Sequence, residues 1–268
     1  MITDSNFHTH TTYCDGKSTP EEVVLAAIEK GLRVIGFSGH CGPDFCAYRM
    51  RDVEGYRKEI NDLKEKYKKE IEIYLGIEEE ALFYANREDY DYILGSCHYV
   101  EMNGINYPVD SGLDKFNKCL EVFGGDYLKF SESYYERFLS YLKVRKPDII
   151  GHFDLVTKFD EKNSIILGSD AKYREIALKY AKEAIKLGLI FEMNTGAISR
   201  GFRTSPYPSM DILREIKKAE GKITICSDSH HKDTLVSNFE EAEDILKEVG
   251  FKEIYTMKNG EFIKVPLK

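Results

Sequence analysis

The histidines of this chain stand where they could bind metal ions together. All seven fall at five places, each at the end of a short apolar run. The five places are NFHTH (His8, His10), IGFSGH (His40), ILGSCH (His98), DIIGH (His152) and CSDSHH (His230, His231). Four carboxylates stand beside them, and these are Asp15, Glu78, Asp154 and Asp228. Imidazole and carboxylate groups are ligands for Zn, Mn and Fe, so this distribution predicts one shared metal site.

The number of candidate ligands indicates more than one ion. Six histidines and three carboxylates exceed the four to six ligands that a single ion takes. We therefore expect two or three divalent ions of Zn, Mn or Fe. Two ions about 3.5–4 Å apart can hold a bridging hydroxide and the oxygens of a phosphoryl group. Each of these residues alone could equally be an ordinary core or surface residue. Their common position at the ends of successive strands is what favours metal binding.

The elements that must position these residues alternate between strand and helix. The apolar runs predict seven strands: Asn6–His10, Val34–Ser38, Glu72–Ile77, Tyr92–Ser96, Asp148–Gly151, Ile190–Met193 and Lys222–Cys226. Helices are expected at about 20–30 and 52–69, and at Glu132–Val144, Ala171–Leu187, Ser209–Ala219 and Phe239–Val249. Strands that alternate with helices predict a parallel sheet, here an α/β barrel. Active sites of such barrels form at the carboxyl ends of the strands, where the histidines fall.

Other segments carry weaker signals. Ser18–Glu22 predicts a capped start of the first helix, and Gly31 predicts its end. The segment Glu101–Lys129 is poorly periodic, which predicts a long loop with one short helix. Glu253–Met257 and Glu261–Val265 surround Asn259-Gly260 and predict a hairpin. No Pro/Gly/Ser-rich linker divides the chain, so we expect a single domain over residues 1–268.

Composition narrows the class of protein. The net charge is −8, and the lysines stand among glutamates, so we expect no nucleic-acid partner. No run approaches a membrane span and the start lacks a signal peptide, so we expect a cytoplasmic protein without membrane contact. The six cysteines form no CxxC pair and are expected to be reduced thiols rather than ligands. The oligomeric state is open.

Seven short motifs together resemble a known family. In chain order they are HTHTTYCDG, GFSGH, GIE, GSCH, GHFDL, EMNTG and SDSH, and they resemble the PHP (polymerase and histidinol phosphatase) family from His8 to His230. NTGAISRGFRTSPYPS resembles the stand-alone histidinol-phosphatases of that family. The resemblance implies a distorted seven-stranded TIM-like barrel. It also implies metal-dependent hydrolysis of a small phosphate monoester, L-histidinol phosphate, to L-histidinol and phosphate in histidine biosynthesis.

The resemblance also implies a ligand set. His8, His10, Glu78 and Asp228 would hold a first metal, and Glu78 would bridge to a second metal held by His98 and His152. A third metal would be held by Asp15, His40 and His230, although relatives have histidine near the position of Asp15. Glu78 is preferred to Glu79 because the family acid follows a Gly-x pair, here Gly76-Ile77. Asp154 is expected to orient a ligand, and His231 to be structural.

The expected reaction assigns further roles. A bridging hydroxide would attack phosphorus, with Glu78, Asp228 and Arg200 as catalytic residues and Asp228 or a histidine moving the proton. Arg200 is the expected phosphate ligand, and the other expected substrate contacts are Arg203, Lys158, Asn194 and Glu192. Three alternatives stay open: a family phosphoesterase acting on another small ester or nucleotide, a domain acting on DNA, and a metal-binding protein without catalysis.

Overall fold

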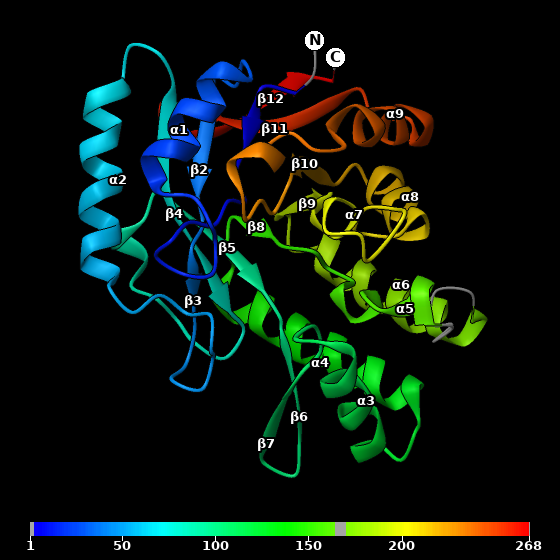
Figure 1. Ribbon diagram of the computed structural model, residues 1–268. Helices are drawn as coiled ribbons and strands as arrows, with labels where there is room; N and C mark the ends of the chain where they lie inside the picture. Colours follow the sequence, from blue (N-terminus) through cyan, green and yellow to red (C-terminus); the bar gives the residue numbers. More distant parts are fainter. Residues whose placement is uncertain (1–2, 164–169, 268) are drawn as a thin grey trace.

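A parallel barrel-like sheet forms the centre of the molecule (Figure 1). The structure, a computed structural model, describes residues 3–163 and 170–267 of the 268-residue chain. Among these residues, seven parallel strands follow one another in the order β1–β2–β4–β5–β8–β9–β10. Their bounds are β1 Ser5–Asn6, β2 Val34–Phe37, β4 Glu72–Glu80, β5 Tyr92–Ser96, β8 Ile149–Ile150, β9 Ile190–Asn194 and β10 Lys222–Cys226. The seven-stranded α/β barrel expected from the sequence is confirmed.

The two ends of the sheet meet beyond β1 and β10. Thr9 forms a parallel bridge with Ser229. The backbone N–H of Ser229 donates to the carbonyl of His8 (3.1 Å), and the N–H of His10 donates to the carbonyl of Ser229 (2.8 Å). We call this contact the seam. It brings the first and last pairs of predicted ligands beside each other.

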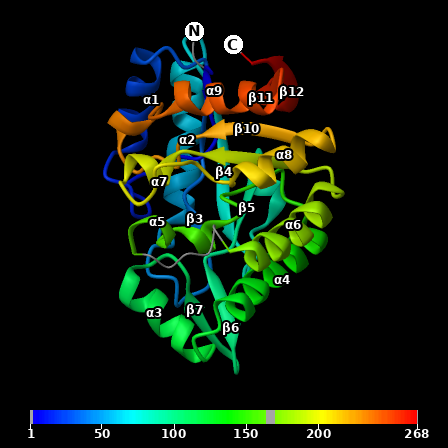
Figure 2. The same ribbon diagram turned by 90° about the vertical axis from the view of Figure 1, so that its right-hand side faces the viewer.

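Helices cover the outside of the sheet and connect successive strands (Figures 1 and 2). The longer ones are α1 Pro20–Glu29, α2 Val53–Tyr67, α3 Leu113–Val122, α4 Tyr127–Arg145, α6 Ala171–Ile185, α8 Met210–Lys218 and α9 Phe239–Val249. α1 begins as predicted, because Thr19 and Glu22 form a reciprocal capping box before Pro20. It ends at Glu29, and Gly31, whose φ of 78° is left-handed, follows two residues later.

The amino end of the barrel is closed by the predicted hairpin. Its strands are β11 (Glu253–Lys258) and β12 (Glu261–Pro266), which are antiparallel. The ring of Phe262 packs against the rings of Phe7 (5.6 Å between centroids) and Tyr92 (6.5 Å). Apolar side chains therefore fill this end of the barrel, and the polar residues are left to the carboxyl end.

The segment Glu101–Lys129 differs from the prediction of a loop with one short helix. It contains the antiparallel strand pair β6 (Tyr99–Met102) and β7 (Ile105–Pro108), followed by α3 and the start of α4. Asn103 and Gly104 form the turn with φ angles of 54° and 76°. An Asn-Gly pair adopts these angles at little cost and is a strong hairpin signal, which the weak periodicity around it obscured.

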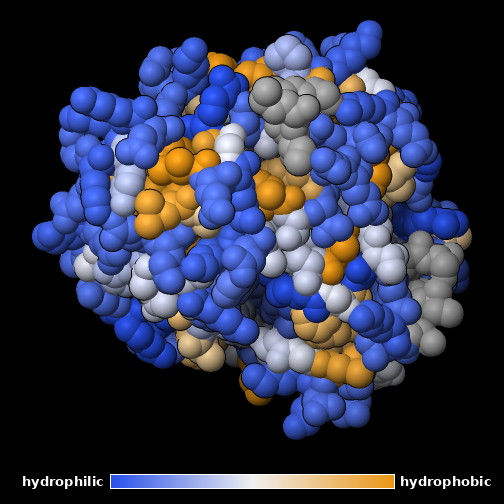
Figure 3. All heavy atoms as spheres, turned by 45° about the horizontal axis from the view of Figure 1, so that its top comes forward, coloured by the Kyte–Doolittle hydropathy of each residue, from blue (hydrophilic) through white to orange (hydrophobic). Residues whose placement is uncertain are grey.

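The surface is mainly polar. Most of the face shown in Figure 3 is hydrophilic, with separate patches of apolar side chains. In the part of the chain that the structure describes, no helix is long and apolar enough to cross a membrane.

Candidate metal centre

The nine predicted metal ligands converge at the carboxyl end of the barrel. Their ligand atoms form four groups whose members lie within 4.8 Å of one another. The groups are His8–His10–Glu78, His8–His152–Asp228, His40–Glu78–His98 and His10–Asp15–His40–His230. The short β3 (His40–Cys41) pairs with β4 and brings His40 opposite Glu78. The sequence therefore identified residues that the fold does bring together.

We call the residues expected to hold a first ion the first site, and they are His8, His10, Glu78 and Asp228. Nε2 of His8 lies 3.4 Å from Oε1 of Glu78 and 3.5 Å from Oδ1 of Asp228. Nε2 of His10 lies 3.2 Å from the same Asp228 oxygen and 3.6 Å from Oε2 of Glu78. Asp228 has a left-handed backbone with φ of 47°, which places its carboxylate at the end of β10.

The second site shares Glu78 with the first. Oε1 of Glu78 lies 3.1 Å from Nε2 of His152 and 3.4 Å from Nε2 of His98. Its other oxygen, Oε2, lies 2.6 Å from Nδ1 of His40. Glu78 therefore faces histidines of both groups and would contact the ions held by each.

The third site consists of Asp15, His40 and His230, with His10 at its edge. Oδ1 of Asp15 lies 3.5 Å from Nε2 of His40 and 3.4 Å from Nε2 of His230. The rings of His10 and His230 are stacked with centroids 4.1 Å apart. His231, in contrast, contacts Asp233 outside the cluster, with 3.3 Å between Nδ1 and Oδ2.

The chemistry of these residues fits divalent cations. Nε2 of His8 and Nε2 of His10 are buried and have no hydrogen-bond partner among the described residues. Buried polar nitrogens without a partner are costly, and a cation between them and the facing carboxylates would satisfy both. We therefore propose these nine residues as the ligands of two or three metal ions.

The protonation states of Glu78 and His10 suit metal binding. Burial raises the pKa of Glu78, but the surrounding histidines outweigh burial and hold it well below its usual value. Burial, together with the neighbouring His230 and His40, lowers the pKa of His10 to about 3. At neutral pH Glu78 is therefore ionised and His10 neutral, the states in which each binds a cation.

A carboxylate behind the second site orients His98. Oε2 of Glu80 accepts from the backbone N–H of His98 (2.9 Å) and lies 2.8 Å from Nδ1 of its ring. This contact leaves Nε2 of His98 free to face Glu78. A carboxylate behind a ligating histidine fixes its tautomer and raises its basicity. The sequence shows that position 80 is a glutamate, but it does not indicate that this glutamate contacts His98.

Glu192 and Asn194 lie behind the first site rather than in a substrate cavity. Oε1 of Glu192 lies 2.6 Å from Nδ1 of His8, and Oε2 accepts from the backbone N–H of His152 (2.7 Å). Asn194 donates to Glu192 (3.0 Å) and accepts from the N–H of Gly196 (2.8 Å). Both side chains are fully buried. This corrects their expected role as substrate contacts, because all their polar contacts stabilise the ligands and the strand end.

A cavity of about 480 Å³ opens onto the metal ligands. Arg200 and Lys158 line it, as expected for cations that contact phosphate. The guanidinium of Arg200 donates to Oδ2 of Asp228 (2.7 Å) and to its carbonyl (2.8 Å). Nζ of Lys158 donates to the carbonyl (3.0 Å) and carboxylate (3.2 Å) of Asp110. Tyr48 also lines the cavity, and the sequence gave no signal for it or for Asp110.

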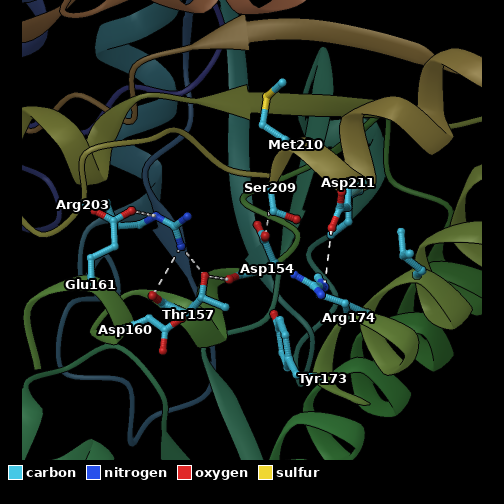
Figure 4. A pocket seen from close by; sticks show the side chains of 13 residues that line it. Asp154, Thr157, Asp160, Glu161, Tyr173, Arg174, Arg203, Ser209, Met210 and Asp211 are labelled. Atoms are coloured by element: carbon cyan, nitrogen blue, oxygen red, sulfur yellow. Dashed lines mark hydrogen bonds and ion pairs between the residues drawn. The ribbon is translucent and has the colours of Figure 1, made fainter. Parts of the chain in front are cut away.

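Arg203 and Asp154 belong to a different cavity. Figure 4 shows this neighbouring cavity of about 640 Å³, in which Arg203 contacts Thr157 and Asp154 lies beside Ser209. Nη1 of Arg203 donates to the carbonyl of Thr157 (3.3 Å), and Oδ2 of Asp154 accepts from the N–H of Ser209 (2.8 Å) at the start of α8. These contacts correct two expectations: Arg203 does not line the metal-site cavity, and Asp154 supports α8 rather than a metal ligand.

Most of the chain matches the model of a known family. The model of the PHP domain matches residues 6–196, more than half of the chain. The chain belongs to the PHP domain family. The part of this PHP domain that the model matches holds seven of the proposed ligands, and Asp228 and His230 follow it at the end of β10.

Relatives of this PHP domain are similar along nearly their whole length. A probable histidinol-phosphatase of Schizosaccharomyces pombe is 25% identical over 97% of this chain and 90% of its own. The histidinol-phosphatase of Lactococcus lactis subsp. lactis is 26% identical over 94% of this chain and 93% of its own. A crystal structure of histidinol phosphate phosphatase from the same organism contains zinc, L-histidinol and phosphate. It shares this fold, with a TM-score of 0.75 and 22% identity over 98% of this chain and 100% of that chain.

Proposed function

We propose that this PHP domain is a metal-dependent phosphomonoesterase that hydrolyses L-histidinol phosphate to L-histidinol and phosphate. The observation that carries the proposal is the buried cluster of nine ligands with Arg200 and Lys158 in the cavity beside it. The names of the relatives, which match almost end to end, support the substrate. A small-molecule substrate, a single domain and a cytoplasmic location are predictions of the same proposal.

The residues that meet the phosphate are those that surround the cluster. Bound divalent ions would supply Lewis acidity and a water of lowered pKa. Arg200 has the planar fork that binds phosphate oxygens, and Asp228 holds it at the wall of the cavity. Burial raises the pKa of Asp228, but Arg200 and His8 outweigh burial and hold it well below its usual value. Asp228 is therefore ionised, which suits a carboxylate that would hold a cation and that also positions Arg200.

One part of the cavity wall suits a leaving group that carries positive charge. Oδ1 of Asp110 is buried and has no hydrogen-bond partner among the described residues, and Oδ2 binds Lys158. The rings of Phe159 and Phe202 lie beside it, with Nζ of Lys158 4.9 Å from the Phe202 centroid. Histidinol carries an ammonium and an imidazole, so a carboxylate and aromatic rings fit its two polar ends.

A panel of phosphate esters tests the proposal. The metal-reconstituted protein is assayed with L-histidinol phosphate, p-nitrophenyl phosphate, a nucleoside monophosphate and bis-p-nitrophenyl phosphate. We expect kcat/KM to be highest for L-histidinol phosphate. Equal kcat/KM values for all monoesters would contradict the assignment of L-histidinol phosphate as the substrate. Hydrolysis of the diester alone would contradict the assignment as a phosphomonoesterase.

The Asp110→Asn variant tests the substrate end of the cavity. It removes the negative charge that pairs with Lys158. We expect kcat/KM for L-histidinol phosphate to fall by about 10- to 100-fold, in line with the loss of a charged hydrogen bond. The value for p-nitrophenyl phosphate, which has no ammonium, should change by less than about threefold. Equal losses for both substrates would contradict this role.

A further inference from the structure

The three metal sites differ in how deeply their ligands are buried. At the first two sites no ligand side chain is more than 7% exposed. At the third site Asp15 is 39% exposed, His230 is 23% exposed and His40 is 11% exposed. Attraction between a cation and its ligands is weaker where water screens it, so burial favours the first two sites.

The sites also differ in what stands behind their histidines. Glu192 lies behind His8 at the first site, and Glu80 lies behind His98 at the second. Such carboxylates strengthen the histidine as a ligand. At the third site Nδ1 of His40 likewise lies 2.6 Å from Oε2 of Glu78. Nδ1 of His230, in contrast, lies 3.0 Å from the carbonyl of Asp228 and 3.0 Å from Nη1 of Arg200. The ligand that is most exposed among the histidines is therefore also the one in contact with a permanent positive charge.

A fixed positive charge distinguishes the third site. Glu78 faces ligands of all three sites, because its Oε2 also lies 2.6 Å from Nδ1 of His40, and Asp228 faces the first site. The third site has Asp15 as its own carboxylate. Arg200 stays charged at every accessible pH and repels a cation placed beside His230.

We propose that the third site is exchangeable: it takes its divalent cation after the first two sites are filled, and in competition with the charge of Arg200. The amount of active enzyme would then follow the free concentration of the metal. This inference rests on the proposed metal-dependent function but not on which phosphate ester is hydrolysed.

Metal content measured without any activity assay tests the order of the sites. The full chain is loaded with Zn²⁺, dialysed against a weak chelator and analysed by inductively coupled plasma mass spectrometry. We expect two ions per chain to remain, and a third to bind again in a Zn²⁺ titration at least 10-fold more weakly. Retention of all three ions, or of fewer than two, would overturn the proposal.

Variants then assign the weak ion to the third site. Asp15→Asn should abolish the weak binding step and leave two retained ions. Arg200→Met should increase the affinity for the weakly bound Zn²⁺ by about 10-fold, because it removes the competing charge. Unchanged or weaker binding would contradict competition between Arg200 and the ion. Glu192→Gln should instead weaken a retained ion, because it acts on His8 at the first site.

A matched control uses the neighbouring histidine. His231→Asn changes a residue next to His230 whose side chain contacts Asp233, so all three binding steps should be unchanged. Circular dichroism of each variant checks that it is folded. Since the readout is bound metal, a wrong substrate assignment would leave these results unaffected, and failure of this inference would leave the substrate panel unaffected.

Discussion

Three consecutive glutamates show how strand geometry assigns roles to single residues. Side chains alternate along β4, so Glu78 and Glu80 face the metal centre whereas Glu79 faces the helices. Glu79 is fully buried and accepts from Tyr141 (2.6 Å) and Arg145 (2.7 Å) of α4. The sequence led to Glu78 through the family motif. It could not assign Glu79, because its side-chain partners Tyr141 and Arg145 lie more than 60 residues away in the chain.

Replacing Glu79 should affect stability and not metal binding. Glu79→Ala leaves the Arg145 guanidinium and the Tyr141 hydroxyl without their partner, and we expect the free energy of unfolding to fall by about 3 kcal/mol. Urea denaturation measures this, with Glu54→Ala at an exposed position of α2 as a control that changes it by less than about 0.5 kcal/mol. A loss of bound metal in folded Glu79→Ala would contradict the structural role.

At the scale of elements, the strand order and the placement of the ligands were predictable because apolar runs alternate with capped helices. The lengths of the strands were harder to predict. β1 stops at Asn6, and His8 and His10 follow it at the seam, whereas β4 extends to Glu80. These ends depend on hydrogen bonds between distant segments, which local sequence patterns do not encode. The same applies to the cavity walls, where Arg200 and Arg203 are close in sequence yet face different cavities.

The close packing of β4 against Tyr92 gives a test at this scale. A Cβ at Gly76 would lie 2.2 Å from the Tyr92 ring, whose hydroxyl donates to the carbonyls of Phe7 (2.6 Å) and Phe37 (3.1 Å). Gly76→Ala should therefore lower the free energy of unfolding by about 1–3 kcal/mol.

A double-mutant cycle identifies the cause of that loss. In a Tyr92→Leu background the ring is gone, so Gly76→Ala should cost clearly less than in the native protein when both are measured by urea denaturation. An equal cost in the two backgrounds would show that the Tyr92 ring is not the obstacle.

At the scale of the whole molecule, the fold keeps its thiols unreactive. All six cysteines are free, and burial raises the pKa of each, to about 11 for Cys14 and Cys46 and to about 12 for Cys41 and Cys119. The pKa values of Cys97 and Cys226 are raised well above the ordinary value. A thiol whose pKa lies above the solution pH stays protonated, and only the thiolate is nucleophilic.

We therefore expect slow modification of the folded protein. At pH 8 Ellman's reagent should react with the native cysteines at least about 100-fold more slowly than with a free thiol of ordinary pKa. The rate should rise with pH as thiolate forms, and all six should react at once in guanidinium chloride. A cysteine that reacts rapidly in the folded protein at pH 8 would contradict the burial of the thiols.

The seam has a consequence for synthesis on the ribosome. His8 and His10 leave the ribosome first, whereas Asp228, the ligand that faces both of them, follows more than 200 residues later. A nascent chain or a product truncated before β10 lacks both Asp228 and the partner strand that bridges Thr9. An ion held jointly by His8, His10 and Asp228 would therefore bind only after translation has passed β10.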